Sequence, residues 1–274
     1  FILSCARKDG LISYQAPRPP HMNFEASHTA IYNHPIAGLC LAELYGMGDS
    51  KLAPRIKAII PKALTWSAHH QHAPKKQAHD RGGWRYLYPC KGSPHVQSDL
   101  SVTSWQLLFM RSAKNAGFKV PAKDVEEAMA YVMRCFDRGQ GTFLYSVGPP
   151  RTVKRAMAGA GILSLSLGGR HDTAMARSAG DWLLRHPFKR YNGGVGLRYH
   201  YSIFYGCQGM FQLGGRYWRQ YFRPTAMTLV THQRADGSFQ PENHKEGYFG
   251  NAYTTALATL GLTAPNQMLP IFQR

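Results

Sequence analysis

A glycine turn followed by an apolar helical segment recurs along this chain, and this repeat constrains the fold more than any other feature. The clearest copy is residues 233–239, Q-R-A-D-G-S-F, which separate the end of one predicted helix from the apolar segment at residues 251–262. Asp236-Gly237 predicts a tight turn, because glycine adopts positive φ at little cost. Similar turns are found at residues 5–12, 81–86, 139–145 and, more loosely, 192–197. An unbroken repeat favours one domain over two.

Each repeat is predicted to be a pair of helices. The first helix is amphipathic and ends at the glycine turn, as expected for residues 55–69, 122–136, 173–186 and 219–233. The second is richer in apolar and small residues, as expected for residues 31–45, 101–113, 152–167, 201–213 and 251–262. Such pairs cannot bury their apolar faces alone, so they must stack or close on themselves. We therefore predict an all-α fold in a single domain at residues 1–274, truncated at its N-terminus within the first repeat.

Two details of this pattern predict local structure. The segment at residues 152–167 would let neighbouring helices approach closely, because it carries Ala156, Ala158, Gly159, Ala160 and Gly161. Residues 67–81, with several histidines and lysines, and the glycine-rich residues 191–197 are both expected to be exposed loops.

Four stretches carry a resemblance to a known superfamily: residues 233–239, residues 82–86 (G-G-W-R-Y), residues 99–105 (D-L-S-V-T-S-W) and residues 253–257 (Y-T-T-A-L). Helix pairs joined by such turns resemble the α/α-toroid superfamily of squalene-hopene-type terpenoid cyclases and protein prenyltransferase β-subunits, and most closely bacterial proteins with prenyltransferase/squalene-oxidase repeats. The resemblance extends over essentially the whole chain. It implies an α/α toroid, a barrel of helix hairpins with inner and outer rings. It also implies that the turn's Gln caps helix ends and that its aromatic ring packs on the next repeat.

The known chemistry of that superfamily is not carried over with the fold. Cyclases of the squalene-hopene type protonate their substrate with a D-x-D-D motif, which does not occur here; Asp99 stands alone before a predicted helix. We favour helix capping for Asp99, with acid catalysis as the alternative, since no neighbouring carboxylate would raise its pKa. Prenyltransferases bind zinc through Asp, Cys and His. Here Cys207 fits that pattern, but Tyr205 replaces the Asp and no His follows, so no metal site is predicted.

A cavity ligand is the leading functional hypothesis. Aromatic side chains with basic neighbours would suit an isoprenoid chain carrying a phosphate, or a carbocation through cation–π contact. About half of the aromatic residues, Trp84 and Phe239 above all, are expected to be core instead. The residues expected to bind the hydrophobic, isoprenoid or lipid ligand are Trp105, Tyr145, Arg155, Tyr201, Tyr205, Cys207, Tyr248 and Tyr253.

A second hypothesis is an enzyme acting on acidic glycans. Toroidal polysaccharide lyases use Tyr, His, Asn and Arg to remove a proton beside a uronate carboxylate. Asn192, Arg198, His200 and Tyr201 offer these residue types in one region, which makes His200 and Tyr201 candidate catalytic residues. The alternative, which we favour, is that Tyr201 and Tyr205 pack on a helix face.

The charge of the chain supports a third hypothesis, a basic scaffold for an anionic partner. The net charge is +18, and residues 138–234 hold fourteen Lys and Arg but two acids. Such a field attracts acidic glycans and anionic membrane surfaces. The alternative is a basic surface that serves solubility alone, because the basic residues are scattered. Nucleic-acid binding would rest on charge alone, because no motif of the standard modules occurs, so it is not expected.

Other patterns limit these hypotheses. Five widely spaced cysteines without C-x-x-C pairs predict mostly buried free thiols rather than disulfides. The histidines at residues 69–79 match no defined metal-site spacing, and no cofactor is predicted. No apolar run reaches the roughly 18–20 residues of a membrane span. The chain starts inside a predicted helix end, so we expect any targeting signal to lie outside residues 1–274, and the compartment stays open.

Overall fold

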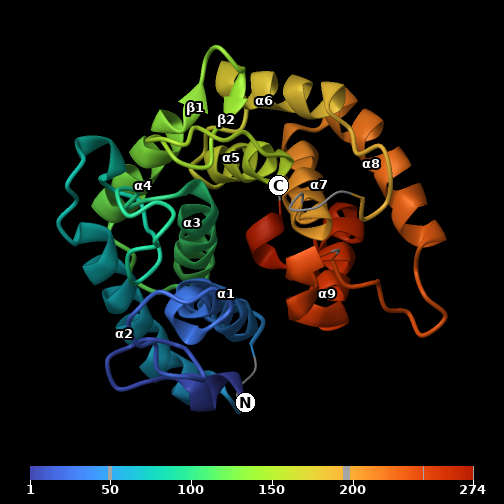
Figure 1. The fold of residues 1–274 in the computed structure, drawn as a ribbon. Helices are drawn as coiled ribbons and strands as arrows, with labels where there is room; N and C mark the ends of the chain where they lie inside the picture. Colours follow the sequence, from blue (N-terminus) through green and yellow to red (C-terminus); the bar gives the residue numbers. More distant parts are fainter. Residues whose placement is uncertain (49–50, 194–197, 243, 274) are drawn as a thin grey trace. The chain divides into compact units, whose positions relative to one another are not determined.

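The computed structural model describes residues 1–48, 51–193, 198–242 and 244–273 and consists mainly of helices over these residues (Figure 1). Its α-helices are α1 (Ala26–Gly46), α2 (Ala53–His72), α3 (Leu100–Asn115), α4 (Ala122–Arg134), α5 (Arg155–Leu167), α6 (Ala174–Arg185), α7 (Tyr199–Leu213), α8 (Gly215–Thr231) and α9 (Gly250–Leu262). Short 3-10 helices are η1 (Ile2–Cys5), η2 (Ala78–Asp80), η3 (His244–Phe249), η4 (Ala264–Asn266) and η5 (Pro270–Phe272). The sheet found in these ranges is one antiparallel pair, β1 (Phe136–Asp137) and β2 (Thr142–Phe143), with Phe136 opposite Phe143.

The all-α fold class predicted from the repeat is confirmed. Each of the nine helical ranges that the sequence predicted overlaps one of α1–α9, with boundaries that differ by a few residues. Caps explain two of the helix starts: Asp99 accepts a 2.8 Å hydrogen bond from the Val102 N–H, and Thr173 accepts one from the Ala176 N–H. Both side chains satisfy backbone donors that have no partner within the helix. None of the described helices combines the length and the hydropathy needed to cross a membrane.

The described residues divide into two compact units. Unit 1 comprises Phe1–Cys135, Ser146–Arg151 and Leu269–Gln273, and unit 2 comprises Phe136–Tyr145 and Thr152–Met268. Each unit has its own apolar core.

Unit 1 is built on α1, which packs against both α2 and α3 (Figure 1). Its core includes Ile56, Ile60 and Phe109, all fully buried. Residues near the chain end also belong to this unit: the Ile271 N–H donates a 3.2 Å hydrogen bond to a carboxylate oxygen of buried Glu43, whose other oxygen accepts from Ser112.

Unit 2 is built on α7, which packs against α5, α8 and α9 (Figure 1). Helices α5 and α7 approach closely because glycines lie at their contact: a methyl group on Gly159 would lie 2.5 Å from the carbonyl carbon of Tyr205. A methyl group on Gly209 would lie 2.8 Å from the carbonyl oxygen of Gly159. The close approach predicted from the small residues of this segment is confirmed.

The turn at residues 233–239 forms as the sequence predicted, with one difference. Gly237 has φ +80°, and the Ser238 N–H donates to Asp236 across the turn. Phe239 is buried in the core of unit 2, as expected. The Gln233 amide, however, donates to the Gly237 carbonyl at 2.9 Å inside the turn, so the expectation that it caps a helix end is wrong.

Two segments that the sequence predicted as exposed loops are residues 67–81 and residues 191–197. The expectation of an exposed loop at residues 67–81 holds only in part: α2 continues to His72, with Ser67 and Gln71 buried, whereas residues 73–77 form a loop that is partly exposed. Gln71 donates to the carbonyls of Gly82 and Asp124, and these contacts hold the end of the helix in place. In the glycine-rich segment, residues 194–197 lie outside the described ranges. The cysteines are free thiols, and Cys5, Cys135 and Cys207 are buried, as predicted.

Candidate functional site

Unit 2 contains a cavity of about 610 Å³. Its walls come from the end of α6, the α6–α7 connection, the first turns of α7 and one side of α8, with Arg155 at the start of α5. The connection at residues 186–191 contributes every one of its six residues to the wall. The cavity is therefore formed by elements that follow one another along the chain, α5 to α8, within one compact unit.

Cationic and imidazole side chains surround this cavity, and no carboxylate occurs among the described residues that line it. These basic residues are Arg155, His186, Lys189, Arg190 and His232. Such a lining creates a positive potential that favours an anion over a neutral or cationic ligand. His186, Lys189, Arg190 and His232 are exposed. The two imidazole rings are held by stacking, His186 on Trp182 and His232 on Tyr191.

The Arg155 side chain is held in place by backbone carbonyls and an aromatic ring. Its Nε donates a 2.5 Å hydrogen bond to the His186 carbonyl, and one terminal nitrogen donates to the Pro187 carbonyl at 3.2 Å. The guanidinium also lies 4.5 Å from the centre of the Phe188 ring. Burial lowers the pKa of Arg155 below its usual value, although nearby Tyr221 opposes this shift. The group stays charged at neutral pH, because an arginine pKa begins far above it.

Aromatic rings supply much of the apolar wall: Phe188, Tyr191, Tyr199 and Tyr221. Phe188 and Tyr199 pack with ring centres 4.7 Å apart. Burial raises the pKa of Tyr199 and of Tyr221 well above the ordinary tyrosine value. Both phenols are therefore neutral at physiological pH and leave the positive charge of the cavity uncancelled.

A buried polar chain runs from this wall into the core of unit 2. The Tyr191 hydroxyl lies 3.3 Å from Nε2 of His200, and Nδ1 of His200 lies 3.1 Å from a carboxylate oxygen of Glu242. Because a carboxylate only accepts, Nδ1 carries the proton, and in a neutral imidazole Nε2 accepts from Tyr191. Glu242 also accepts from the backbone N–H groups of Tyr199 and His200, at 3.0 and 2.6 Å. It thereby caps α7 from a distant part of the chain.

Of the eight predicted ligand-binding residues, Arg155 lines this cavity and the other seven do not. Tyr201, Tyr205 and Cys207 are buried within α7, and the rings of Tyr201 and Tyr205 meet edge to face at 5.0 Å. The packing of these two tyrosines is the alternative that the sequence favoured. Burial raises the pKa of the Cys207 thiol, so this cysteine is poorly suited to act as a thiolate.

The remaining predicted ligand residues lie elsewhere. Trp105 is buried on α3 in unit 1. Tyr145 lies in unit 2 with the Lys154 ammonium 5.6 Å from its ring centre. Tyr248 is exposed, and Tyr253 packs on Phe249 near the start of α9.

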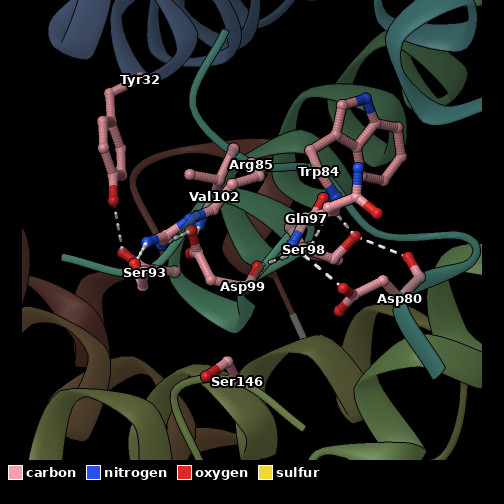
Figure 2. A network of polar contacts seen from close by, with 12 residues as sticks. Tyr32, Asp80, Trp84, Arg85, Ser93, Gln97, Ser98, Asp99, Val102 and Ser146 are labelled. Atoms are coloured by element: carbon pink, nitrogen blue, oxygen red, sulfur yellow. Dashed lines mark hydrogen bonds and ion pairs between the residues drawn. The ribbon is translucent and has the colours of Figure 1, made fainter. Parts of the chain in front are cut away.

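The candidate catalytic residue Asp99 belongs to a polar network in unit 1 (Figure 2). One of its carboxylate oxygens caps α3, and the other accepts a 2.6 Å hydrogen bond from Arg85, which also donates to Ser93. Asp99 is fully buried, and both of its carboxylate oxygens are engaged in these contacts. This arrangement confirms the capping role. Because Arg85 donates to both Asp99 and Ser93, Asp99 also links residues 85–93 to α3.

Neighbouring Asp80 is also buried in this network (Figure 2). Its Oδ2 accepts from the Gln97 N–H at 3.0 Å, and its carbonyl accepts from the Ser98 hydroxyl. Burial raises the pKa of Asp80. No group of metal-ligating side chains was found in the part of the chain that the structure describes.

Sequence reasoning missed most of the cavity. Tyr191, Tyr199, Tyr221 and His232 were not among the predicted ligand residues, and neither was Glu242 as the partner of His200. The available signal was the excess of Lys and Arg between positions 138 and 234, which includes Arg155, Lys189 and Arg190 of the lining.

Comparison with known proteins adds no assignment: no protein-family model matches the chain, and no curated protein matches its sequence.

Proposed function

We propose that the cavity of unit 2 binds an amphipathic anion, an isoprenoid or another lipid that carries a phosphate. The observation that carries this proposal is the composition of the wall. Five basic side chains and four aromatic rings face one space, and no acid occurs among its described lining residues. The cations would meet the phosphate, and the rings together with Leu183, Leu184 and Ile203 would cover the apolar chain.

The size of the cavity supports a small organic ligand. Ligand sites commonly enclose roughly 300–1,000 Å³, and the 610 Å³ of this cavity fall within that range. A site of this kind places a few polar groups among mostly apolar walls. Arg155 supplies such a group in a fixed position, because two backbone carbonyls already orient its guanidinium.

We also propose that the helix pairs form an α/α toroid, as the resemblance to terpenoid cyclases and prenyltransferase β-subunits implies. Support comes from the packing within each unit: α1 packs on α3 in unit 1, and α7 packs on both α5 and α9 in unit 2. These are the helices of the apolar, inner type. Within unit 1, η5 also packs on α1 and α3.

The function that we propose is binding, without the cyclase or prenyltransferase chemistry of the resembling families. The sequence lacks D-x-D-D, and the stretch that matches the zinc motif retains Cys207 alone. The ligand would be held by charge and apolar contact.

Calorimetric titration tests this proposal. The probes are farnesyl phosphate, farnesol, inorganic phosphate and an oligouronate. We expect farnesyl phosphate to bind most tightly, since it alone uses both the cations and the apolar wall. Replacing Lys189 and Arg190 with Met should weaken farnesyl phosphate about tenfold or more and leave farnesol unchanged, because hydrogen bonds to charged groups contribute roughly 1.5–3 kcal/mol.

The matched control is the double substitution of Arg55 and Lys62 with Met, on α2 of unit 1. It removes the same charge from an exposed surface outside the cavity. Equal affinity for farnesyl phosphate and inorganic phosphate, or an equal loss in the control variant, would contradict the proposal.

An enzyme on acidic glycans remains the second candidate, favoured by the chain Tyr191–His200–Glu242. A tyrosine at the cavity wall with a buried imidazole behind it has the composition of a proton-transfer pair. The same titration distinguishes this candidate. Tight binding of the oligouronate, with growing ultraviolet absorbance from an unsaturated product and loss of product in Tyr191→Phe, would replace the lipid proposal.

A further inference from the structure

Helix α8 exposes a face that the cavity does not use. Arg219, Arg223, Met227 and Val230 follow one another at spacings of four, four and three residues, so they lie on one side of the helix. All four are exposed, and the two apolar ones strongly so, with 65% of Met227 and 61% of Val230 accessible. These four residues are called the α8 strip below.

The arginines of the α8 strip are available for a partner. Neither Arg219 nor Arg223 forms an ion pair with any residue in the described ranges. Arg216, one turn earlier, differs because it pairs with Asp181 at 2.5 Å. Residues 215–231 contain no acid at all, so the charge of this helix is not balanced within it.

The strip runs beside the cavity. Gln220, Pro224 and Thr228 line the cavity from α8, and each follows a member of the strip by one position in the sequence. Successive residues on a helix are about 100° apart, so the two rows are adjacent on its surface. Exposed Lys189 and Arg190 extend the positive charge along the cavity wall.

We propose that the α8 strip docks unit 2 on an anionic lipid bilayer. The arginines would meet the phosphates of the headgroups, while Met227 and Val230 would enter the boundary between headgroups and acyl chains. A basic helix with exposed apolar side chains fits such an interface. A nucleic acid would use the arginines equally but would gain nothing from exposed Met and Val. The further step, that the bilayer supplies the ligand to the adjacent cavity, rests on the proposed function.

Vesicle flotation tests the docking. The full chain is mixed with vesicles of phosphatidylcholine alone, or of phosphatidylcholine with phosphatidylglycerol. We expect binding to the anionic vesicles, weakened by salt because exposed charges are screened. Arg219→Gln/Arg223→Gln should reduce the affinity about 25-fold, at about fivefold for each arginine. Met227→Ser/Val230→Ser should also reduce it, by about tenfold.

Two matched control variants make the same kinds of substitution on unit 1, away from the α8 strip. Arg55→Gln/Lys62→Gln removes two charges from α2, and Met47→Ser removes an exposed methionine of unit 1. We expect both to bind anionic vesicles as the wild type does. Circular dichroism on heating should give the same midpoint for every variant, because all of these side chains are exposed.

The outcomes separate the alternatives. Loss confined to the two α8 variants supports the docking. Equal loss in the α2 variant, or full binding by Met227→Ser/Val230→Ser, overturns it in favour of diffuse electrostatic attraction. Preference for double-stranded DNA over vesicles also overturns it. The α8 strip does not line the cavity, so farnesyl phosphate should bind the α8 variants as it binds the wild type. The docking proposal can therefore fail while the cavity proposal stands, and the cavity proposal can fail while the docking proposal stands.

Discussion

His34 shows how one buried residue links pH to the stability of unit 1. Its Nδ1 accepts a 3.0 Å hydrogen bond from the Ile12 N–H, and its Nε2 lies 3.2 Å from the Ala63 carbonyl and 3.0 Å from the Ser67 hydroxyl. Both ring nitrogens are thus engaged in the neutral form. Burial lowers the pKa of His34 from 6.5 to about 3, although the Ala63 carbonyl opposes the shift.

The neutral imidazole should therefore stabilise the fold in a defined pH range. The unfolded chain takes up a proton near pH 6.5, which the folded chain takes up only near pH 3. The contribution of His34 is complete above pH 6.5 and is lost as the pH falls toward 3, at roughly 1.4 kcal/mol per pH unit. Urea unfolding of the wild type and His34→Gln at several pH values measures it.

We expect His34→Gln to be less stable at pH 7 and the difference to shrink by about 2–3 kcal/mol by pH 4.5. Glutamine keeps one acceptor and one donor but does not titrate in this range. A constant difference between the two proteins across these pH values would contradict the account of His34.

Single residues differed in how far the sequence could predict them. Asp99 as a cap was predictable, because its partner Val102 is three residues away. The roles of His34 and Glu242 were not, since their partners lie up to 33 and 43 residues away in the sequence. Nothing in a local pattern indicates such a pairing.

At the scale of elements, the contact of α5 with α7 depends on the absence of side chains. Gly159 faces the backbone of Tyr205 and Gly206, and Gly209 faces Gly159 in return. Backbone atoms cannot rotate away as a side chain can, so added volume at this contact must separate the helices.

We expect Gly159→Ala to lower the free energy of unfolding by about 3 kcal/mol, the upper part of the range for overpacked sites. Gly46→Ala is the control, because a methyl group there would meet Ala116 at an ordinary 3.7 Å. Since alanine favours helices, the control should be neutral or slightly stabilising. Denaturant unfolding measures both, and equal stabilities would show that α5 and α7 are not held in close contact.

The helices were predicted from the sequence better than the single-residue contacts or the cavity. The 3.6-residue pattern and the glycine turns located each α-helix of the described residues, because helices form from local signals. The loop expectation failed at residues 67–72 for a tertiary reason. Polar Ser67 and Gln71 looked exposed, but Ser67 bonds to His34 and Gln106, and the Gln71 amide nitrogen donates to the Gly82 and Asp124 carbonyls. Polar composition alone cannot distinguish a loop from a helix whose polar side chains are paired.

At the scale of the molecule, the excess of basic residues in the sequence and the positively charged cavity of unit 2 are connected. The sequence located the excess of positive charge at residues 138–234, and the structure gathers five basic residues from this region around one cavity of unit 2. The sequence predicted Arg155 for the ligand site but not the rings, because which face of α7 and α8 meets the cavity depends on packing between helices. The α8 strip adds a surface of the same charge beside it.

Native mass spectrometry of the protein after incubation with a total lipid extract tests the central claim most directly. The wild type should retain one anionic lipid per chain, recoverable by organic extraction, because the cations and rings of the cavity hold both of its ends. Thr228→Trp, which fills the cavity from α8, should retain none while unfolding at the wild-type temperature. A wild type that emerges without lipid, or a Thr228→Trp variant that retains as much, would contradict lipid binding in this cavity.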